Sequence, residues 1–421
     1  MRSFLLTALA FAATLCRSSS FAPASSKPAN HNHLLCNNSR TKLKLSPGDI
    51  AAGPLLYPAV FAACFRIGAA LSVIGQPRLP NDDGEASSRR LVGSKVVRLP
   101  NLGSRVRVFY PISDKAANVI SASSQNNNDK YCTDGRATSD GMAGLVGFRQ
   151  LGLSFLLAHL GDAPSGCCAE GTGSDGVLAS CESGAPLLVY SHGYGGNMDM
   201  AVYFLRAVAQ QGIVVAAVEH TDGTASSTVL PNDSRLDFDS KLFSLRDGLN
   251  RRANELREAV EYLPSLLPEF SGRIFLGGHS YGAPSALLAS QRQRPWDSCK
   301  VSGLILHDPA LSMGRSLQLP PKLPTVSYVS DEYNRGGIKC GDATYHIKGA
   351  FHGNFVDAPL WAPLWVMRTL SLVIPACGPS DPETVHRQLA ESARAFCFAP
   401  IGEDPIANTG VGGQSLFERV G

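Results

Sequence analysis

The chain has 421 residues, of which 44% are hydrophobic and 8% aromatic, so it can bury a substantial core and is not a disordered chain. Charged residues make up only 17%, the formal net charge is +3, and no basic stripe is present, which argues against a nucleic-acid-binding protein. Residues 1–47 contain six basic residues and no Asp or Glu, which leaves residues 48–421 with a formal charge of −3. The basic character therefore belongs to the N-terminus.

The first 47 residues have the composition of a targeting sequence. An apolar run from Ser3 to Leu15 follows Met1 and Arg2, and small residues follow the run, which predicts a signal peptide over residues 1–20. Residues 21–47 are rich in Ser, Asn and Lys and lack acids, as transit peptides are. The two parts together resemble the bipartite plastid presequence of algae with secondary plastids. We expect a plastid location; the alternatives are an extracellular protein and a disordered tail after the signal peptide.

Residues 48–95 form a second apolar segment. Its apolar run, residues 50–75, is interrupted by Pro54, Pro58 and Arg66. A central arginine costs a membrane-spanning helix about 2.5–3.5 kcal/mol on insertion scales. We therefore predict a packed or interfacial segment, with a membrane anchor as the alternative.

The eleven cysteines do not predict a metal site or a cofactor, since no CxxC pair and no Cys/His metal spacing occurs. Cys167 and Cys168 fall in a Gly- and Ser-rich stretch, residues 161–184, which we expect to be an exposed loop. Disulfides among Cys340, Cys377 and Cys397 are an option, but nothing in the sequence fixes their pairing.

From residue 96 onward, short apolar strands alternate with helices. We predict a β-rich hairpin within residues 96–110, then strands at 187–191, 213–218, 273–277, 301–306, 325–329 and 344–347. Helices are predicted at 198–211, 243–263, 283–291 and 382–398. This alternation predicts an α/β protein with a doubly wound, mostly parallel sheet and helices on both faces. We assign residues 96–400 to one domain of this kind and residues 401–421 to a C-terminal tail.

The strongest local motif is GHSYG at residues 278–282, which matches G-x-S-x-G. An apolar strand precedes it and a helix of small residues follows, so the chain would turn sharply at Ser280, with glycines where side chains would clash. Ser280 is the predicted nucleophile. An ordinary glycine turn is the alternative.

A serine hydroxyl needs a base and an acid that orients the base. Two histidines follow the motif at suitable places, and we choose His352, which lies in a loop able to bend back, over His346, which lies inside a predicted strand. Two carboxylates end strands in the right order, Asp308 one strand after the nucleophile strand and Asp331 two strands after. The simple topology of the fold favours Asp331 as the acid. The residues alone do not decide between Asp308 and Asp331.

The oxyanion of the reaction needs backbone N–H donors. Residues 191–197, SHGYGGN, follow the first central strand and resemble the HG-type oxyanion loop of lipases and esterases. We expect the backbone N–H groups of Tyr194 and Tyr281 to form the pair. A phosphate-binding loop is the alternative, but neither G-x-G-x-x-G nor G-x-x-x-x-G-K-[ST] is present.

Further motifs stand in a recognisable order. VEHTD at 218–222, LHD at 306–308, SDEY at 330–333 and HGNFVD at 352–357 resemble, in this order, segments of the plasma-type, calcium-independent platelet-activating factor acetylhydrolase family. The last segment follows the family pattern His-x-Asn-Phe-x-Asp, and the resemblance extends over roughly residues 90–360. Tyr281 replaces the more usual Phe. Residues 161–184 and those past Trp361 show no clear match, which leaves the substrate open.

The resemblance implies an α/β-hydrolase fold, a Ser280–His352–Asp308 triad and a serine esterase. Its implied reaction is hydrolysis of the sn-2 acetyl or short or oxidised acyl ester of phospholipids (a 1-alkyl-2-acetylglycerophosphocholine esterase) without calcium. The partner would be a phospholipid or another lipid ester, and the tryptophan-containing residues 361–367 are predicted to form either a peripheral membrane interface or core. One alternative is another plastid esterase, chlorophyllase-like or a general carboxylesterase. Another is a non-catalytic binding protein of the same fold.

Overall fold

The computed structural model describes residues 90–122, 128–169, 178, 180–239, 245–294, 297–314, 317–372, 376–399 and 416–421. The predicted signal peptide, the transit-like presequence and the apolar run 50–75 lie outside these residues. Within the described ranges, no helix is both long and apolar enough to cross a membrane.

The described residues are organised around an 11-stranded sheet with the order β13-β12-β11-β10-β9-β5-β6-β2-β1-β4-β3. In chain order its strands are β1 (Val92–Arg98), β2 (Arg105–Pro111), β3 (Asn128–Lys130), β4 (Pro164–Ala169), β5 (Leu187–Ser191), β6 (Val214–Val218), β9 (Ile274–His279), β10 (Val301–His307), β11 (Thr325–Val329), β12 (Ala343–Ile347) and β13 (Phe417–Arg419). Strands β7 (Ser227–Val229) and β8 (Arg235–Asp237) form a separate antiparallel hairpin.

The centre of the sheet is parallel. Strands β6, β5, β9, β10, β11 and β12 are parallel neighbours, while β2 and β13 pair antiparallel at either side of them. Strands β5, β6, β9 and β11 are buried at every position, because helices cover both faces of this part of the sheet. The predicted doubly wound, mostly parallel sheet is confirmed.

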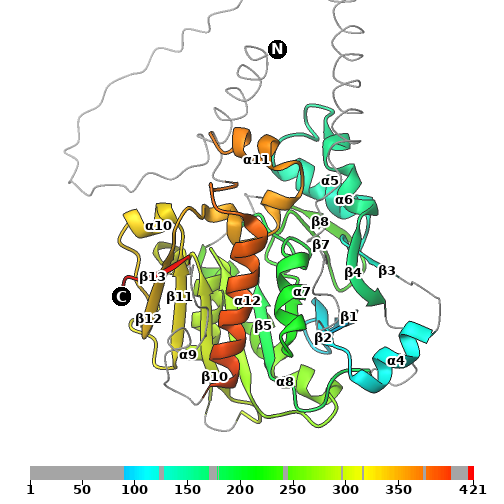
Figure 1. Cartoon of the computed structure of the whole chain (residues 1–421), viewed down its shortest axis with the longest axis vertical. Helices are drawn as coiled ribbons and strands as arrows, with labels where there is room; N and C mark the ends of the chain where they lie inside the picture. Colours follow the sequence, from blue (N-terminus) through cyan, green and yellow to red (C-terminus); the bar gives the residue numbers. More distant parts are fainter. Residues whose placement is uncertain are drawn as a thin grey trace, which may run out of the picture. The chain divides into compact units, whose positions relative to one another are not determined.

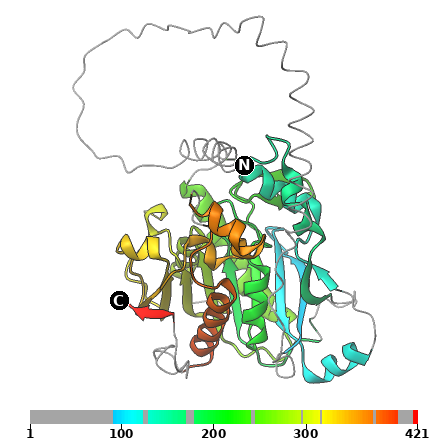
Figure 2. The same cartoon turned by 45° about the horizontal axis from the view of Figure 1, so that its top comes forward.

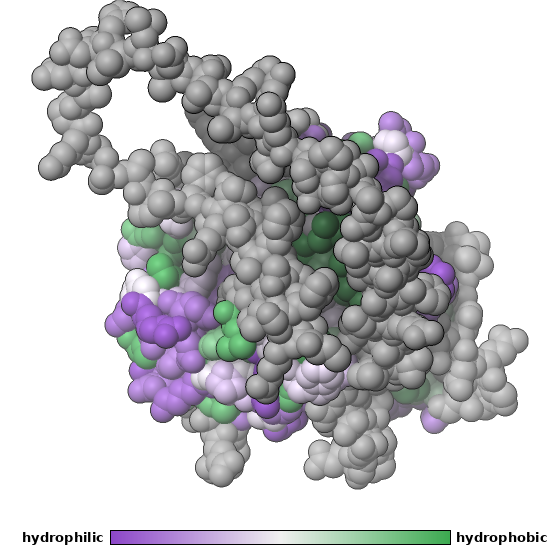
Figure 3. All heavy atoms as spheres, turned by 90° about the horizontal axis from the view of Figure 1, so that it is seen from above, coloured by the Kyte–Doolittle hydropathy of each residue, from purple (hydrophilic) through white to green (hydrophobic). Residues whose placement is uncertain are grey.

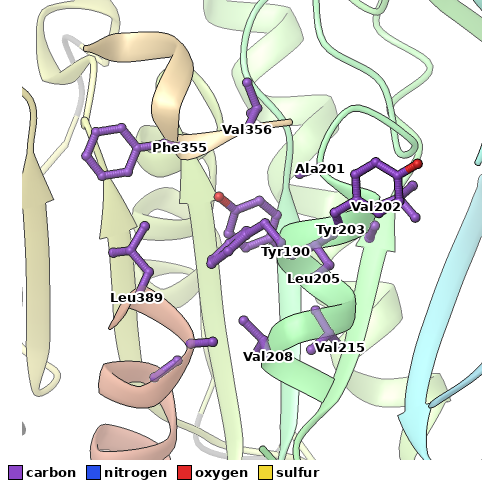
Figure 4. Close-up of a cluster of buried hydrophobic side chains, with 14 of the residues drawn as sticks. Tyr190, Ala201, Val202, Tyr203, Leu205, Val208, Val215, Phe355, Val356 and Leu389 are labelled. Carbon is purple, nitrogen blue, oxygen red and sulfur yellow. The ribbon is translucent and has the colours of Figure 1, made fainter. Parts of the chain in front are cut away.

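Two helix pairs cover the two faces (Figure 1). Helices α7 (Val202–Gln210) and α12 (Pro382–Phe398) contact each other on one face, and α8 (Leu245–Tyr262) and α9 (Gly282–Gln291) contact each other on the other. Each face has its own hydrophobic cluster. Figure 4 shows part of the first, where Tyr190 of β5, Leu205 of α7 and Leu389 of α12 lie near Phe355 and Val356.

The remaining helices are short: α4 (Asp114–Ala122), α5 (Arg136–Leu145), α6 (Ala158–Asp162), α10 (Asp331–Arg335) and α11 (Leu364–Leu370). Single 3₁₀ turns occupy η1 (Ser154–Leu156), η2 (Leu263–Leu266), η3 (Leu311–Met313), η4 (His352–Phe355) and η5 (Ala358–Leu360). Helix α10 directly follows the carboxyl end of β11, and α11 lies toward the same end of the sheet in both ribbon views (Figures 1 and 2).

The structure differs from the prediction at both edges of the sheet. Strand β1 begins at Val92, before the expected domain start, because residues 92–98 pair along their whole length with β2. Part of the expected C-terminal tail forms β13, where Phe417 packs against the rings of Tyr328 and Tyr345. A three-residue strand has too few positions to show a hydrophobic period.

The expected exposed loop at residues 161–184 is wrong for its first part. Residues 164–169 form β4, which pairs with β1 and β3 and buries Cys167. This strand consists mainly of small residues, so it lacks the apolar alternation by which strands are recognised. Cys340, Cys377 and Cys397, considered as disulfide partners, are free thiols.

Candidate active site

Ser280 lies in a tight turn between β9 and α9. Its φ of 55° falls in the left-handed region, which non-glycine residues rarely adopt. The turn is held from the neighbouring strand, because the Ser280 N–H donates to the carbonyl of His307 at 2.9 Å and the Ser280 carbonyl accepts from the N–H of Ala310 at 3.1 Å. Such strained positions persist only where the surroundings fix them, and they concentrate at functional sites.

The two glycines of the G-x-S-x-G motif permit this turn. A Cβ at Gly278 would lie 2.4 Å from the carbonyl of Gly282. A Cβ at Gly282 would lie 2.0 Å from the carbonyl oxygen of Ser191, at the end of β5. Both distances are far below contact, so the close approach of α9 to β5 and β9 requires glycine at both positions.

Asp308 and His352 meet beside this turn. Asp308 is fully buried after β10, and its Oδ2 lies 2.7 Å from Nδ1 of His352. The other carboxylate oxygen accepts the N–H of Ser330 at 2.7 Å, which fixes the carboxylate plane. An ionised carboxylate only accepts hydrogen bonds, so this contact places the proton on Nδ1 and leaves Nε2 of His352 as the basic nitrogen.

The imidazole of His352 contacts two other rings. The ring of Tyr333 stacks on it with a centroid distance of 5.2 Å and an interplanar angle of 10°. The ring of His279 lies 4.4 Å away at 38°. Burial holds the pKa of His279 well below its usual range, so His279 is an uncharged neighbour. About a quarter of the His352 side chain, 27%, remains exposed.

The residues that follow His352 hold its loop in place. The Asn354 Oδ1 accepts the N–H groups of Phe351, at 2.9 Å, and Gly378, at 2.7 Å. The buried Asp357 accepts the N–H groups of residues 203 and 204 at the start of α7, at 2.8 and 3.1 Å. Phe355 projects into the core (Figure 4). The Asn, Phe and Asp of the His-x-Asn-Phe-x-Asp segment therefore anchor the loop.

The alternative acid and the alternative histidine pair with each other. Asp331 Oδ1 lies 2.7 Å from Nε2 of His346 and also accepts the N–H of Gly349 at 3.2 Å. Asp331 thus supports the start of the loop that carries His352. The structure brings Asp308, and not Asp331, to His352.

The predicted oxyanion residues approach Ser280 from two sides. Gly193 lies so close that a Cβ on it would be 3.1 Å from the Cβ of Ser280. Tyr194 follows it, with a 40% exposed side chain, while Tyr281 is buried directly after Ser280. The two tyrosine rings meet edge to face at 6.3 Å. The segment that contains Gly193 therefore lies next to Ser280, where we expect the oxyanion donors.

One buried residue beside the candidate site was not predicted. Arg252 of α8 is fully buried, and its Nη1 donates to the carbonyl oxygen of His192 at 2.5 Å while its Nε donates to Asp222 at 2.8 Å. Its guanidinium carbon lies 4.8 Å from the centroid of the Tyr281 ring. Burial alone would raise the pKa of Asp222, but the charge of Arg252 outweighs it and lowers that pKa below its usual range. Arg252 therefore contacts both segments of the predicted oxyanion site.

The VEHTD segment supplies further buried support. The carboxylate of Glu219 pairs with Arg105 at 2.6 Å. The imidazole of His220 bridges the Ser191 hydroxyl and the Glu255 carboxylate, at 2.7 Å each. Burial raises the pKa of Glu255 to about 7. These side chains hold the strand ends below the oxyanion loop and are too deeply buried to meet a substrate.

A small cavity of about 10 Å³ lies under the oxyanion loop. Its walls include His192, Gly193, His279 and Val356. This volume suits about one water molecule rather than an acyl chain. Among the residues that the structure describes, no group of three or more His, Cys, Asp or Glu side chains is arranged to hold a metal ion.

Comparison with known proteins agrees with the motifs. A family model described as platelet-activating factor acetylhydrolase, isoform II, matches residues 85–259. Over these residues the resemblance is confirmed. The match includes the oxyanion loop and the VEHTD segment and ends before Ser280.

The chain is also similar to solved structures of esterases. A ferulic acid esterase from Streptomyces cinnamoneus is 17% identical, with 76% of this chain and 91% of that chain covered and a TM-score of 0.51. An esterase from Pyrobaculum calidifontis is 11% identical, with 81% and 94% covered and a TM-score of 0.38. The fold is that of an α/β-hydrolase. Together with the family match, it supports a carboxylic ester hydrolase.

Proposed function

We propose that this protein is a serine esterase that removes the sn-2 acetyl or short or oxidised acyl chain from phospholipids. The observation that carries the proposal is the 2.7 Å contact between Asp308 and His352 beside the strained turn at Ser280. The family match supports the phospholipid substrate, since the matched acetylhydrolase family is named for this chemistry.

The proposed reaction has two halves. Nε2 of His352 takes the proton of Ser280 Oγ, which attacks the ester carbonyl carbon, and the N–H groups of Tyr194 and Tyr281 stabilise the oxyanion. His352 then protonates the leaving oxygen of the lyso-lipid as the bond to the acyl carbon breaks. In the second half His352 activates water, which attacks the acyl-enzyme, and the proton returns to Ser280 Oγ as the carboxylic acid leaves.

A fluorophosphonate probe tests the nucleophile. We expect the purified protein to be labelled at one site and the Ser280→Ala variant to remain unlabelled while keeping the wild-type melting temperature. A folded wild-type protein that resists the probe would instead favour a non-catalytic binding protein.

A substrate panel tests the specificity. It comprises p-nitrophenyl esters of increasing chain length, an acetylated ether phospholipid, long-chain phospholipids and chlorophyll. We expect turnover of the short esters and the acetylated phospholipid. Turnover of chlorophyll alone would favour the chlorophyllase-like alternative, and turnover of simple esters without any phospholipid would favour a general carboxylesterase.

We also propose that the protein touches membranes through the segment that follows the histidine loop. The segment after the histidine loop is partly packed and partly exposed. The Trp361 Nε1 donates to the hydroxyl of Tyr131 at 2.9 Å, whereas Trp365 is 64% and Leu372 82% exposed. Figure 3 looks onto the upper end of the molecule as Figure 1 shows it, and hydrophobic residues appear there at several separate places among those drawn in colour. The exposed apolar side chains support a peripheral, interfacial mode of contact.

For the location of the protein we propose import into a plastid through residues 1–47. The basic, acid-free composition of that segment supports this proposal. A fluorescent protein fused to residues 1–47 and expressed in cells with secondary plastids should accumulate in the plastid. Accumulation in the medium would favour the extracellular alternative.

A further inference from the structure

The short helix α10 and the residue before it contact all three members of the proposed triad. The N–H of Ser330 donates to the Asp308 carboxylate at 2.7 Å, and the Ser330 hydroxyl caps α10 by accepting the N–H of Tyr333 at 3.3 Å. The ring of Tyr333 stacks on the imidazole of His352, and its hydroxyl lies beside the Ser280 side chain. Tyr333 therefore touches both groups that exchange the proton.

We propose that Tyr333 is a fourth catalytic residue, whose ring stabilises the His352 imidazolium and whose hydroxyl donates a hydrogen bond to Ser280 Oγ as that oxygen loses its proton. This inference rests on the proposed triad. In the step concerned, the proton of Ser280 Oγ moves to Nε2 of His352 as the Oγ–carbon bond forms. Tyr333 keeps its own proton throughout and only supplies a hydrogen bond.

The geometry favours the charged state of the reacting groups over the resting state. An aromatic face attracts a cation within about 6 Å of its centroid, and the two ring centroids lie 5.2 Å apart in nearly parallel planes. A hydroxyl beside an oxygen becomes a more stabilising donor as that oxygen loses its proton and gains partial negative charge. Both contacts strengthen together when the proton leaves Ser280, so they raise kcat rather than substrate affinity.

The surroundings keep Tyr333 able to donate. Burial raises the pKa of the Tyr333 hydroxyl to about 12, so it is protonated at neutral pH. Among the described residues, the titratable groups that face His352 are Asp308 from the end of β10, His279 from β9 and Tyr333 from α10. His279 is uncharged because burial lowers its pKa, so Asp308 and Tyr333 are the two groups that stabilise a positive His352.

Two substitutions separate the ring from the hydroxyl. Tyr333→Phe keeps the stack and removes the donor, and Tyr333→Leu removes both. The matched control is Tyr262→Phe, which removes a phenolic hydroxyl from α8, on the face of the sheet opposite α7 and α12. The acylation rate is measured from the p-nitrophenol burst with p-nitrophenyl acetate, together with KM, the pH profile of kcat/KM and the melting temperature.

We expect acylation to fall about 10-fold in Tyr333→Phe and about 100-fold in Tyr333→Leu, with KM nearly unchanged and Tyr262→Phe at the wild-type rate. The acidic limb of the pH profile should move to lower pH in Tyr333→Leu alone, because the imidazolium loses the ring that stabilises it. Wild-type acylation rates in both variants would overturn the proposal. Equal losses in both variants with an unshifted acidic limb would overturn the role of the ring.

Separate controls test whether the variants fold and whether the protein is a serine esterase at all. If Tyr333→Leu lowers the melting temperature, Tyr333→Phe still tests the hydroxyl, since it retains the packing of the ring. A wild-type protein that forms no fluorophosphonate adduct at all would refute the serine esterase itself. A wild-type protein that is labelled, with unaltered kinetics in both variants, would refute only the role of Tyr333.

Discussion

The carboxylate of Asp308 lies 2.7 Å from Nδ1 of His352, although the two residues are 44 positions apart in the chain. Strand β10, which Asp308 follows, is the hydrogen-bonded neighbour of β9, which leads to Ser280. The acid therefore lies one strand from the nucleophile. The carboxylate two strands away, Asp331, instead pairs with His346 and the backbone of the histidine loop.

This arrangement predicts unequal effects for the two carboxylates. Asp308→Asn should lower kcat on a short p-nitrophenyl ester by about 10³–10⁴-fold, because the amide no longer favours the tautomer that leaves Nε2 free. Asp331→Asn should cost less than about 10-fold, since it only loosens the loop at Gly349. Both variants should keep the wild-type melting temperature within a few degrees. The reverse order of effects would assign the acid to Asp331.

The role of Arg252 is tested by a conservative substitution. Arg252→Lys keeps the charge but cannot reach His192, Asp222 and Thr224 together, so the oxyanion loop should lose its fixed position. We expect kcat to fall about 10–100-fold with KM within about threefold, and a trifluoromethyl ketone, which forms a tetrahedral adduct with the serine, to bind more weakly in proportion.

The matched control for this substitution is Arg105→Lys. Arg105 is also buried, and its guanidinium donates to the carboxylates of Glu219 and Asp134 rather than to the predicted oxyanion loop. It should affect the melting temperature more than kcat. Equal losses of kcat in the two variants would mean that Arg252 contributes only to general stability.

The sequence indicated the parts of the site whose local chemistry is distinctive. The glycines on either side of Ser280 indicate a strained turn. The order of the predicted strands and of the polar residues that follow them places Asp308 and His352 after this turn. The choice between Asp308 and Asp331 needed the family resemblance, because both residues end parallel strands. The role of Arg252 could not be predicted from the sequence. In an amphipathic helix with many charged residues, the pattern does not show which arginine is buried. Strand β4 was missed because small residues give no hydrophobic period.

The buried Asp357 predicts a pH dependence of stability. Burial raises its pKa from the ordinary 3.8 to about 7 in the folded protein. Between about pH 4 and pH 7 the folded state then holds a proton that the unfolded state has released, so the free energy of unfolding falls as the pH rises through this window. The slope for one proton is at most about 1.4 kcal/mol per pH unit.

Urea unfolding at several pH values measures this effect. The free energy of unfolding of Asp357→Asn should depend less steeply on pH than that of the wild type between about pH 4 and pH 7, because the amide does not titrate. Glu255→Gln should flatten the curve in the same direction, since burial also raises the pKa of Glu255 to about 7. Parallel curves for the wild type and Asp357→Asn would show that Asp357 is ionised in the folded protein throughout.

The exposed apolar side chains after the histidine loop predict how the protein meets its substrate. Trp365→Glu should weaken flotation with neutral phosphatidylcholine vesicles about 10-fold and raise KM on vesicle-bound acetylated phospholipid, while kcat/KM on soluble p-nitrophenyl acetate stays unchanged. The reason is that an interfacial tryptophan loses apolar contact with lipid when it becomes a carboxylate. Added salt should have little effect on binding of the wild type, because residues 48–421 carry a net charge of −3 and attraction to the membrane is apolar.

A Leu319→Glu variant, at an exposed apolar residue in the loop between β10 and β11, is the control and should bind vesicles like the wild type. Equal loss of binding in both variants would point to a general effect of added negative charge rather than to a docking surface at α11.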